Sequence, residues 1–184
     1  MRTAMAASVT LVAGLASPCL ANGPSSTIAG GYAHAVAITQ SGEATGWGYD
    51  ELGQLWFPEG ETPARVAASG QVTVWLLADG SALATGEFDD GTKPPTNTDF
   101  VDVATAGGIA LGLRANGTLY WWGRFGSIPG SPPAGTYLKI AGAGSAFSFI
   151  RTDGSLAAWG TNFMGALDVP PGNDYVALGG GPVA

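Results

Sequence analysis

The sequence has one cysteine and one histidine, and this scarcity removes several classes of functional site. With Cys19 as its only thiol, the chain can build neither a disulfide framework nor a cluster of thiolate metal ligands. His34 has no second histidine to join it in a metal site or a catalytic set. We therefore expect no metal, no cofactor and no catalytic residue, and we interpret His34 as a structural hydrogen-bonding side chain.

Positive charge is also scarce. Seven Lys and Arg residues stand against 14 Asp and Glu residues, and the formal net charge is −7. A sequence-independent nucleic-acid binder needs a basic face to replace counterions, and docking on anionic lipid needs clustered Lys and Arg. The composition therefore argues against nucleic-acid and membrane partners. Helical periodicity is missing too, which leaves strands and loops.

Glycine is abundant, at 30 of 184 residues, and much of it belongs to an internal repeat. The repeat period is about 37 residues. Each unit opens with an aliphatic residue: Ile28, Val66, Val103, Ile140 and Leu178. The chain thus divides into four units and the start of a fifth: 28–65, 66–102, 103–139, 140–177 and 178–184.

Each unit contains three apolar runs. The first is short and small, as in IAGG and IAGAG, and predicts an inner strand where backbones approach closely. A turn pair separates the second run from the third: Ser41-Gly42, Asp79-Gly80, Asn116-Gly117 and Asp153-Gly154. Asp-Gly and Asn-Gly predict a two-residue hairpin turn, because both residues can adopt positive φ. Loops rich in Pro and Gly then lead to the next unit.

These features predict an all-β fold, a β-propeller whose three-stranded blades contain about 37 residues each. A linear β-solenoid is the alternative, although solenoid coils are usually shorter and have no hairpin per turn. Aliphatic positions of the second run share a slot that we expect in the core between blades: Val36, Val74, Leu111 and the misfit Ser148. Tryptophans that recur before glycine are expected to pack between blades: Trp47, Trp122 and Trp159. Thr85 takes this position in unit two.

Residues 30–55 read GGYAHAVAITQSGEATGWGYDELGQL, and their Gly-Gly, His, Trp-Gly and Gly-Gln-Leu marks resemble the repeat of the regulator of chromosome condensation family. Unit four is similar to the short secreted bacterial type of this repeat, which includes propeller-fold β-lactamase inhibitors. The resemblance implies seven blades and a protein-binding platform made by loops on one face. Seven such units would take roughly 260 residues. We therefore expect that this chain is a piece of a longer protein. The alternatives are an open array of four blades that a partner closes, and a small closed ring.

Residues 1–21 read as a secretory signal peptide. They contain a positive charge near the start, an apolar run too short to span a bilayer, and small residues before a cleavage point at Asn22. A lipid-attached Cys19 is a weaker alternative, because Pro18 stands where such sites need a small residue. We expect residues 22–184 to form the repeat domain and the protein to be secreted or periplasmic.

Several large apolar side chains in the loops after the third run do not recur between units: Tyr49, Trp56, Phe57, Phe88, Phe125, Phe163 and Met164. Loops carry recognition, and aromatic residues dominate interface energetics. We expect these residues to form a binding face for a protein, or possible glycan, partner. The alternative is that they fold back and cap the blades.

The leading interpretation is a secreted, non-catalytic β-propeller binding module that mediates protein–protein interaction through its blade loops. The alternatives are an extracellular propeller hydrolase or lyase with its site in the central channel, or a cell-surface structural repeat protein. Charged side chains in the first run of each unit would favour the enzyme. As delimited by the repeat, these runs hold only Gly, Ala, Ser, Thr and aliphatic residues.

Overall fold

The computed structural model describes residues 27–87, 96, 99–123 and 128–180, and this part of the chain consists of strands, turns and loops. The described residues include no helix long and apolar enough to cross a membrane. The strands are β1 (Ile28–Gly30), β2 (His34–Ile38), β3 (Ala44–Gly48), β4 (Pro63–Ser69), β5 (Val72–Leu77), β6 (Ala82–Gly86), β7 (Phe100–Ala106), β8 (Ile109–Arg114), β9 (Leu119–Gly123), β10 (Tyr137–Ala143), β11 (Ala146–Arg151) and β12 (Leu156–Gly160). The predicted signal peptide, 1–21, lies outside the described residues.

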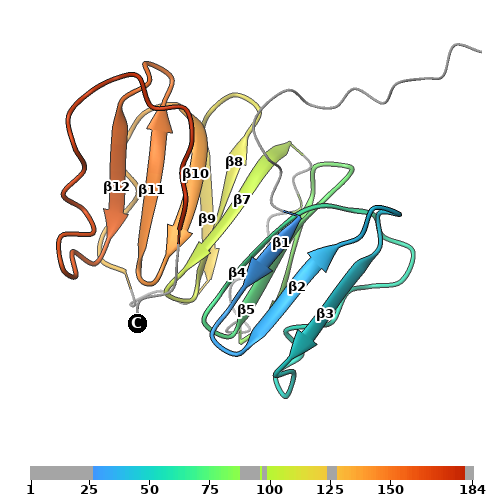
Figure 1. Ribbon diagram of the computed structural model, residues 1–184. Coiled ribbons are helices and arrows are strands. Elements are labelled where there is room, and N and C mark those ends of the chain that lie inside the picture. The colour runs from blue at the N-terminus through green and yellow to red at the C-terminus, as the bar shows by residue number, and fades with distance from the viewer. Residues whose placement is uncertain (1–26, 88–95, 97–98, 124–127, 181–184) are drawn as a thin grey trace, which may run out of the picture.

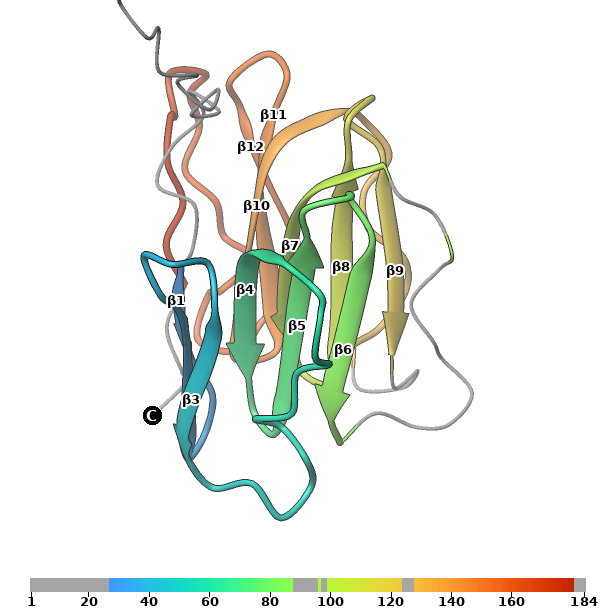
Figure 2. The same ribbon diagram turned by 90° about the vertical axis from the view of Figure 1, so that its right-hand side faces the viewer.

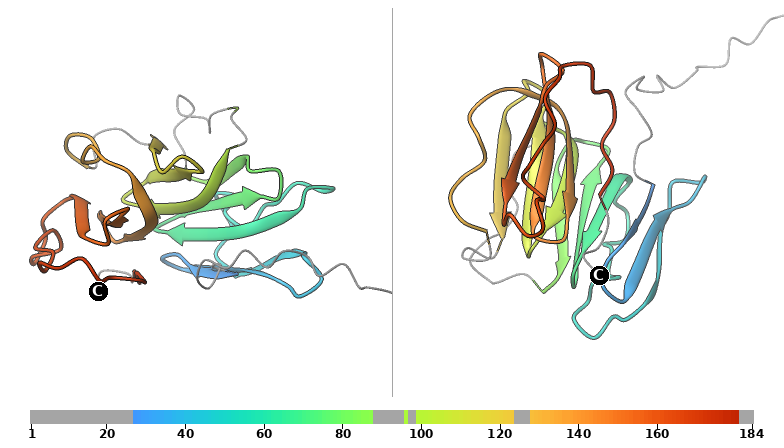
Figure 3. Two further views of the ribbon diagram at one scale, coloured as in Figure 1. Left: turned by 90° about the horizontal axis from the view of Figure 1, so that it is seen from above. Right: turned by 60° about the vertical axis from the view of Figure 1, so that its left-hand side comes forward.

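The strands form four three-stranded antiparallel sheets, in the orders β1-β2-β3, β4-β5-β6, β7-β8-β9 and β10-β11-β12 (Figure 1). Figure 2 shows β6 and β9 on the outer side of their sheets. Seen from above, the sheets follow one another around a common axis (Figure 3). Their inner strands, β1, β4, β7 and β10, line one central cavity. The prediction of an all-β propeller is therefore confirmed, with four blades in the described part of the chain.

The hairpin turns lie where the sequence predicts them, but they have three residues rather than two. In the second blade, Leu77 donates its N–H to the carbonyl of Ser81 and accepts the N–H of Gly80. Only the glycine has positive φ, 83° at Gly80, as in a type I turn followed by one left-handed residue. The prediction that both residues of the turn pair adopt positive φ is therefore wrong. Asp79 instead accepts the hydroxyl and the N–H of Ser81, and these bonds lower the pKa of its carboxyl.

Three apolar clusters fill the spaces between the four successive blades. Middle-strand side chains that point to the next blade are fully buried in the first three blades: Val36, Val74 and Leu111. The sequence prediction for this slot is confirmed there. Ser148 has the same slot in the fourth blade, faces away from the third blade, and is only partly buried.

The recurrent tryptophans show how a blade packs on its neighbour. Trp159 is 5% exposed and lies against Trp121 of the preceding blade, with 5.5 Å between ring centroids. Trp122, 2% exposed, belongs to the cluster between the second and third blades. Both pack between blades, as predicted, and both point to the preceding blade. Trp47 is 54% exposed, so the predicted packing role is wrong for this residue, because no described blade precedes the first one.

Thr85 fills the tryptophan position of the second blade because Gln54 occupies the space beside it. The Thr85 hydroxyl donates to the carbonyl of Gln54 at 3.3 Å, and Gln54 is completely buried. In the fourth blade, the indole N–H of Trp159 makes the equivalent bond to the carbonyl of Pro129 at 2.9 Å. Both side chains therefore tie the outer strand of a blade to the loop that precedes the blade.

His34 has the structural role that the sequence predicts. Its Nε2 lies 2.9 Å from the hydroxyl of Thr73, across the interface between the first two blades, and the residue is 5% exposed. Burial lowers the pKa of the imidazole, and the charge of Asp50 opposes this shift only in part. A neutral imidazole therefore links the two blades at neutral pH.

The inner strands begin earlier than the repeat pattern indicates, and this changes the lining of the channel. β4 begins at Pro63 rather than Val66, and β7 and β10 begin equally early. The added residues bring Arg65, Asp102 and Lys139 into the inner strands. The expectation that these strands hold only small and aliphatic residues is therefore wrong, and the channel carries charge.

Candidate binding surface

The channel along the propeller axis has two chemically different ends. One end, the Tyr32 end, is formed by the connections from the first to the second strand of the blades, at 31–33 in the first blade and 144–145 in the fourth. The other end, the Arg65 end, is formed by the starts of the inner strands. The Tyr32 end lies at the bottom of Figure 1, where β1 and β10 end.

A pocket of about 440 Å³ opens at the Tyr32 end, lined by residues of the first, second and fourth blades. Its walls are mostly glycine, alanine and serine, among them Gly30, Ala68, Ser69 and Gly142. Gly142 is needed for packing, since a Cβ atom there would lie 2.2 Å from the carbonyl oxygen of Thr105. The small side chains at this crowded position also leave the pocket unfilled.

Large apolar side chains stand at the rim of this pocket. Tyr32 lies between β1 and β2, where its N–H donates to the carbonyl of Gly70 at 2.7 Å, and it is 85% exposed. Phe163 lines the pocket from the loop after β12 and is 54% exposed, and the adjacent Met164 is 90% exposed. Aromatic residues and methionine are enriched at protein interfaces. We call Tyr32, Phe163 and Met164 the Tyr32 surface.

The loop that carries Phe163 and Met164 is fixed by its own hydrogen bonds. The side-chain oxygen of Asn162 accepts the N–H of Leu167 at 3.0 Å. A second bond, from the N–H of Ala166 to the carbonyl of Phe163, closes a turn in which Met164 has a φ of 52°. Left-handed backbone costs about 1–2 kcal/mol for a side chain such as methionine. The loop therefore holds Met164 outward in a strained conformation.

The loop after β3 repeats this construction in the first blade. There the carboxylate of Asp50 accepts the N–H of Leu55 at 2.7 Å, as Asn162 does for its counterpart in the fourth blade. Leu52 occupies the loop position of Met164 and is 42% exposed. The first and fourth blades therefore each present an exposed apolar side chain at the tip of the loop that follows their third strand.

The structure separates the loop residues that the sequence groups into one binding face. Phe163 and Met164 lie together at the Tyr32 surface. Trp56 is 56% exposed but does not line the pocket. Phe57 packs edge to face against the buried Trp75, with 4.9 Å between ring centroids. Phe57 therefore caps the space between two blades, as in the alternative interpretation of the loops.

The remaining predicted residues contribute less to this surface. Tyr49 is partly buried and donates its hydroxyl to Glu51 at 3.1 Å, a bond that raises the pKa of the phenol. Phe88 and Phe125 lie outside the described residues.

Tyr32 is missing from the sequence prediction, which considers only the loops after the third strand. The signal is present in the repeat nevertheless. The other units have glycine where the first has Tyr32, namely Gly70, Gly107 and Gly144, and each of these glycines has positive φ. Tyr32 itself does not have positive φ, and its connection has three residues where the other blades have two, so an exposed aromatic side chain is accommodated at this position.

Comparison with known sequences identifies the repeat of the first blade. The sequence model of the regulator of chromosome condensation (RCC1) repeat matches residues 26–54. The resemblance to this repeat is thereby confirmed for one unit of the chain. A comparison with curated proteins gives no match.

Comparison with solved structures extends the similarity to about three quarters of the chain. The CRINKLY WD40 ectodomain of the Arabidopsis thaliana receptor kinase ACR4 has a TM-score of 0.64 and 18% identity, over 74% of this chain and 50% of that chain. The ectodomain of the Physcomitrella patens receptor kinase CR4 has a TM-score of 0.60 and 18% identity, over 73% and 40%. Yeast RCC1 (Prp20), bound to Kap60, has a TM-score of 0.60 and 19% identity, over 73% and 43%. The fold is an RCC1-like β-propeller.

This RCC1-like propeller spans half or less of the length of the similar structures. Propellers of this type commonly mediate protein interactions. Yeast Prp20 is seen bound to Kap60, and the Saccharomyces cerevisiae protein is described with binding properties to Gsp1p and histones.

Proposed function

We propose that this RCC1-like propeller is a secreted, non-catalytic protein-binding module that contacts its partner through the Tyr32 surface. The observation that carries the proposal is the position of Tyr32 and Phe163, each more than half exposed, on a pocket with small walls, with the 90% exposed Met164 directly after Phe163. A side chain of the partner would enter the pocket, and the exposed rings would cover its apolar part.

The strained backbone at Met164 supports a binding role. A left-handed methionine is less stable than an asparagine or glycine in the same turn, and strain of this kind concentrates at functional sites. Nothing in the packing requires methionine there, because its side chain is 90% exposed. Contact with a partner would account for both features.

The channel gives the enzyme alternative less support. Asp102 is the only acidic residue among the described residues that line the channel. The two carboxyl groups that glycoside hydrolysis usually requires are therefore not found together there.

Affinity capture from the source organism tests the proposed contact surface. Immobilised wild-type protein should retain one or more extracellular proteins, and the double variant Tyr32→Ser, Phe163→Ser should lose them. The control is Trp56→Ser, which removes a side chain as exposed as Phe163 but outside the pocket. Equal capture by the wild type and the double variant, at equal melting temperature, would overturn the proposal.

Secretion is tested separately, by the intact mass of the extracellular protein after expression of the full sequence in its source organism. We expect a mature chain that begins at Asn22. Retention of residues 1–21 in a cell-associated protein would contradict the proposed export.

A further inference from the structure

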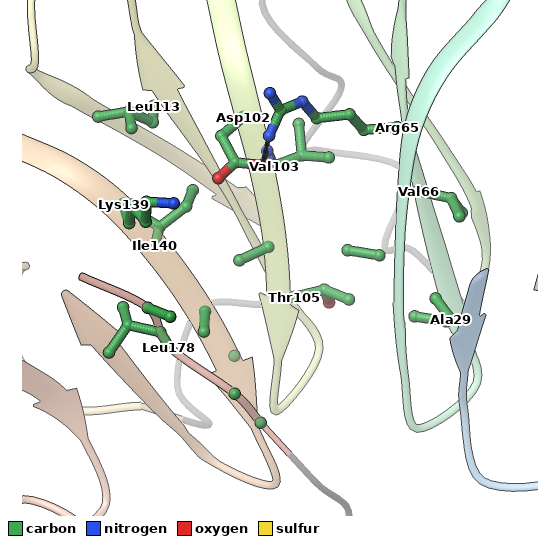
Figure 4. Close-up of a pocket in the computed structure, with 18 of the residues that line it drawn as sticks. Ala29, Arg65, Val66, Asp102, Val103, Thr105, Leu113, Lys139, Ile140 and Leu178 are labelled. Atoms are coloured by element: carbon green, nitrogen blue, oxygen red, sulfur yellow. Dashed lines mark hydrogen bonds and ion pairs between the residues drawn. The ribbon is translucent and has the colours of Figure 1, made fainter. Parts of the chain in front are cut away.

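The Arg65 end of the channel has a construction of its own. Three inner strands contain a β-bulge close to their start, between Pro63 and Arg65 in β4, and the same irregularity recurs in β7 and β10. The residue directly after each bulge is charged: Arg65, Asp102 and Lys139. Bulges redirect side chains. All three of these residues line the channel (Figure 4).

The three charges do not balance. Arg65 donates to the carboxylate of Asp102 at 3.3 Å, and the same oxygen accepts the N–H of Val103 at 3.0 Å. Lys139 approaches Asp102 from the opposite side to Arg65 (Figure 4), but within the described residues it has no hydrogen bond and no ion pair. Two cations and one carboxylate leave one net positive charge in a partly buried cavity of about 400 Å³.

Exposed aliphatic side chains surround this charge. Ile28 is 64% exposed, Val101 43% and Leu138 57%, and all three line the same cavity. Val101 and Leu138 are the bulged residues that precede Asp102 and Lys139. The bulge therefore turns the charged residue towards the channel and leaves its aliphatic neighbour at the rim in two successive blades.

We propose that the Arg65 end of the channel binds an aliphatic carboxylate. The carboxylate would lie against the ammonium of Lys139 and the free side of the Arg65 guanidinium, since both groups bind carboxylates by charge-assisted hydrogen bonds. The alkyl part would contact Ile28, Val101 and Leu138. A monoanion matches the single net positive charge, and the apolar rim favours an alkyl chain over inorganic phosphate.

The charge of Asp102 opposes the proposed ligand, so its removal should have the opposite effect to the removal of Lys139. The Asp102 carboxylate competes with the ligand for Arg65 and Lys139, so a carboxylate ligand should bind more tightly when this charge is removed. In contrast, a purely structural ion pair would give no ligand dependence in either direction.

Titration of the full-length protein with hexanoate, followed by amide chemical shifts in NMR spectra, tests this site. We expect saturable shifts near Val103 and Ile140, and none with hexanamide, which has the same chain without the charge. Lys139→Gln should weaken binding about tenfold, in line with the loss of a hydrogen bond to a charged group. Asp102→Asn should strengthen binding severalfold. Arg151→Gln, which removes one positive charge away from this cavity, should leave binding unchanged.

A second probe distinguishes a free acid from a carboxylate that another polypeptide presents. A short peptide that ends in valine with a free carboxyl group is compared with its amidated form. Binding of hexanoate and peptide alike supports the site for either source, and binding of the peptide alone assigns it to a polypeptide terminus. Failure of both carboxylates, equal binding of the uncharged analogues, or weaker binding by Asp102→Asn would overturn the proposal.

Discussion

Trp159 and Trp47 occupy the same repeat position, and we predict that their replacement by alanine has very different costs. Trp159 stacks on Phe147 with 5.4 Å between ring centroids, contacts Trp121 at 5.5 Å, and donates its indole N–H to Pro129. Among the described residues, no blade lies in front of Trp47, which keeps 54% of its surface exposed. The contribution of this tryptophan to the free energy of unfolding should depend on the preceding blade, because stacked repeats stabilise one another through their interfaces.

The two magnitudes follow from burial. Removal of a buried tryptophan typically costs about 3–5 kcal/mol, because a cavity adds to the lost transfer free energy. Trp159, at 5% exposure, should lie in this range. Trp47 loses less apolar contact and leaves no cavity, so Trp47→Ala should cost at most about 1–2 kcal/mol.

Urea unfolding followed by far-ultraviolet circular dichroism measures both costs without using the fluorescence of the replaced residue. For a chain of this size, the melting temperature should fall by roughly 2–4 °C for each kcal/mol. If Trp47→Ala proves as destabilising as Trp159→Ala, the reasoning is refuted. Another surface would then cover Trp47 in solution, and sedimentation velocity would show whether this surface belongs to a second copy.

Three further perturbations test particular contacts. Met164→Asn should raise the free energy of unfolding by about 1 kcal/mol, because asparagine tolerates the left-handed backbone, and an unchanged urea midpoint would argue against strain. The wild type should lose stability as the pH falls from about 6.5 towards the lower folded pKa of His34, since the unfolded state takes up the proton first, and His34→Gln should flatten this part of the melting profile. Gly142→Ala should destabilise by about 1–3 kcal/mol through its clash with the Thr105 carbonyl, whereas Gly30→Ala, at the same repeat position with no atom within 4 Å, should be tolerated; equal melting temperatures would contradict this packing.

The fold is largely readable from the sequence because each blade is a local structure. The turn glycine at Gly80 and its equivalents follow every middle strand, and the recurrence of Val74 and Leu111 at one repeat position identifies the side of the strand that packs on the next blade. Identical patterns in four units then leave few architectures that bury every face.

The sequence predictions fail where the position of a residue depends on a neighbouring blade or on irregular backbone. The packing role of Trp47 required a blade in front of it, which a slot-by-slot comparison of units does not reveal. The inner strands extend past a bulge, and a bulge interrupts the periodicity that delimits a strand in a sequence. Arg65 therefore falls just outside the run that the repeat delimits, although it belongs to the wall of the channel. Phe57 packs against Trp75, a residue of the next blade, and this contact cannot be read from the loop sequence alone.

The same comparison of units indicates where function should be sought in such an array. Repeat positions that hold the same type of residue in several units, such as the position of Trp159, are explained by packing between blades. Positions with the same backbone environment but different chemistry in each unit are not explained by packing. Arg65, Asp102 and Lys139 are of this second kind, because they place unlike charges at one bulge. Tyr32 differs from its counterparts in backbone as well, since it lacks the positive φ of Gly70, Gly107 and Gly144. Both proposed sites include residues at which the units differ, because a repeated scaffold leaves its differences free to be selected for binding.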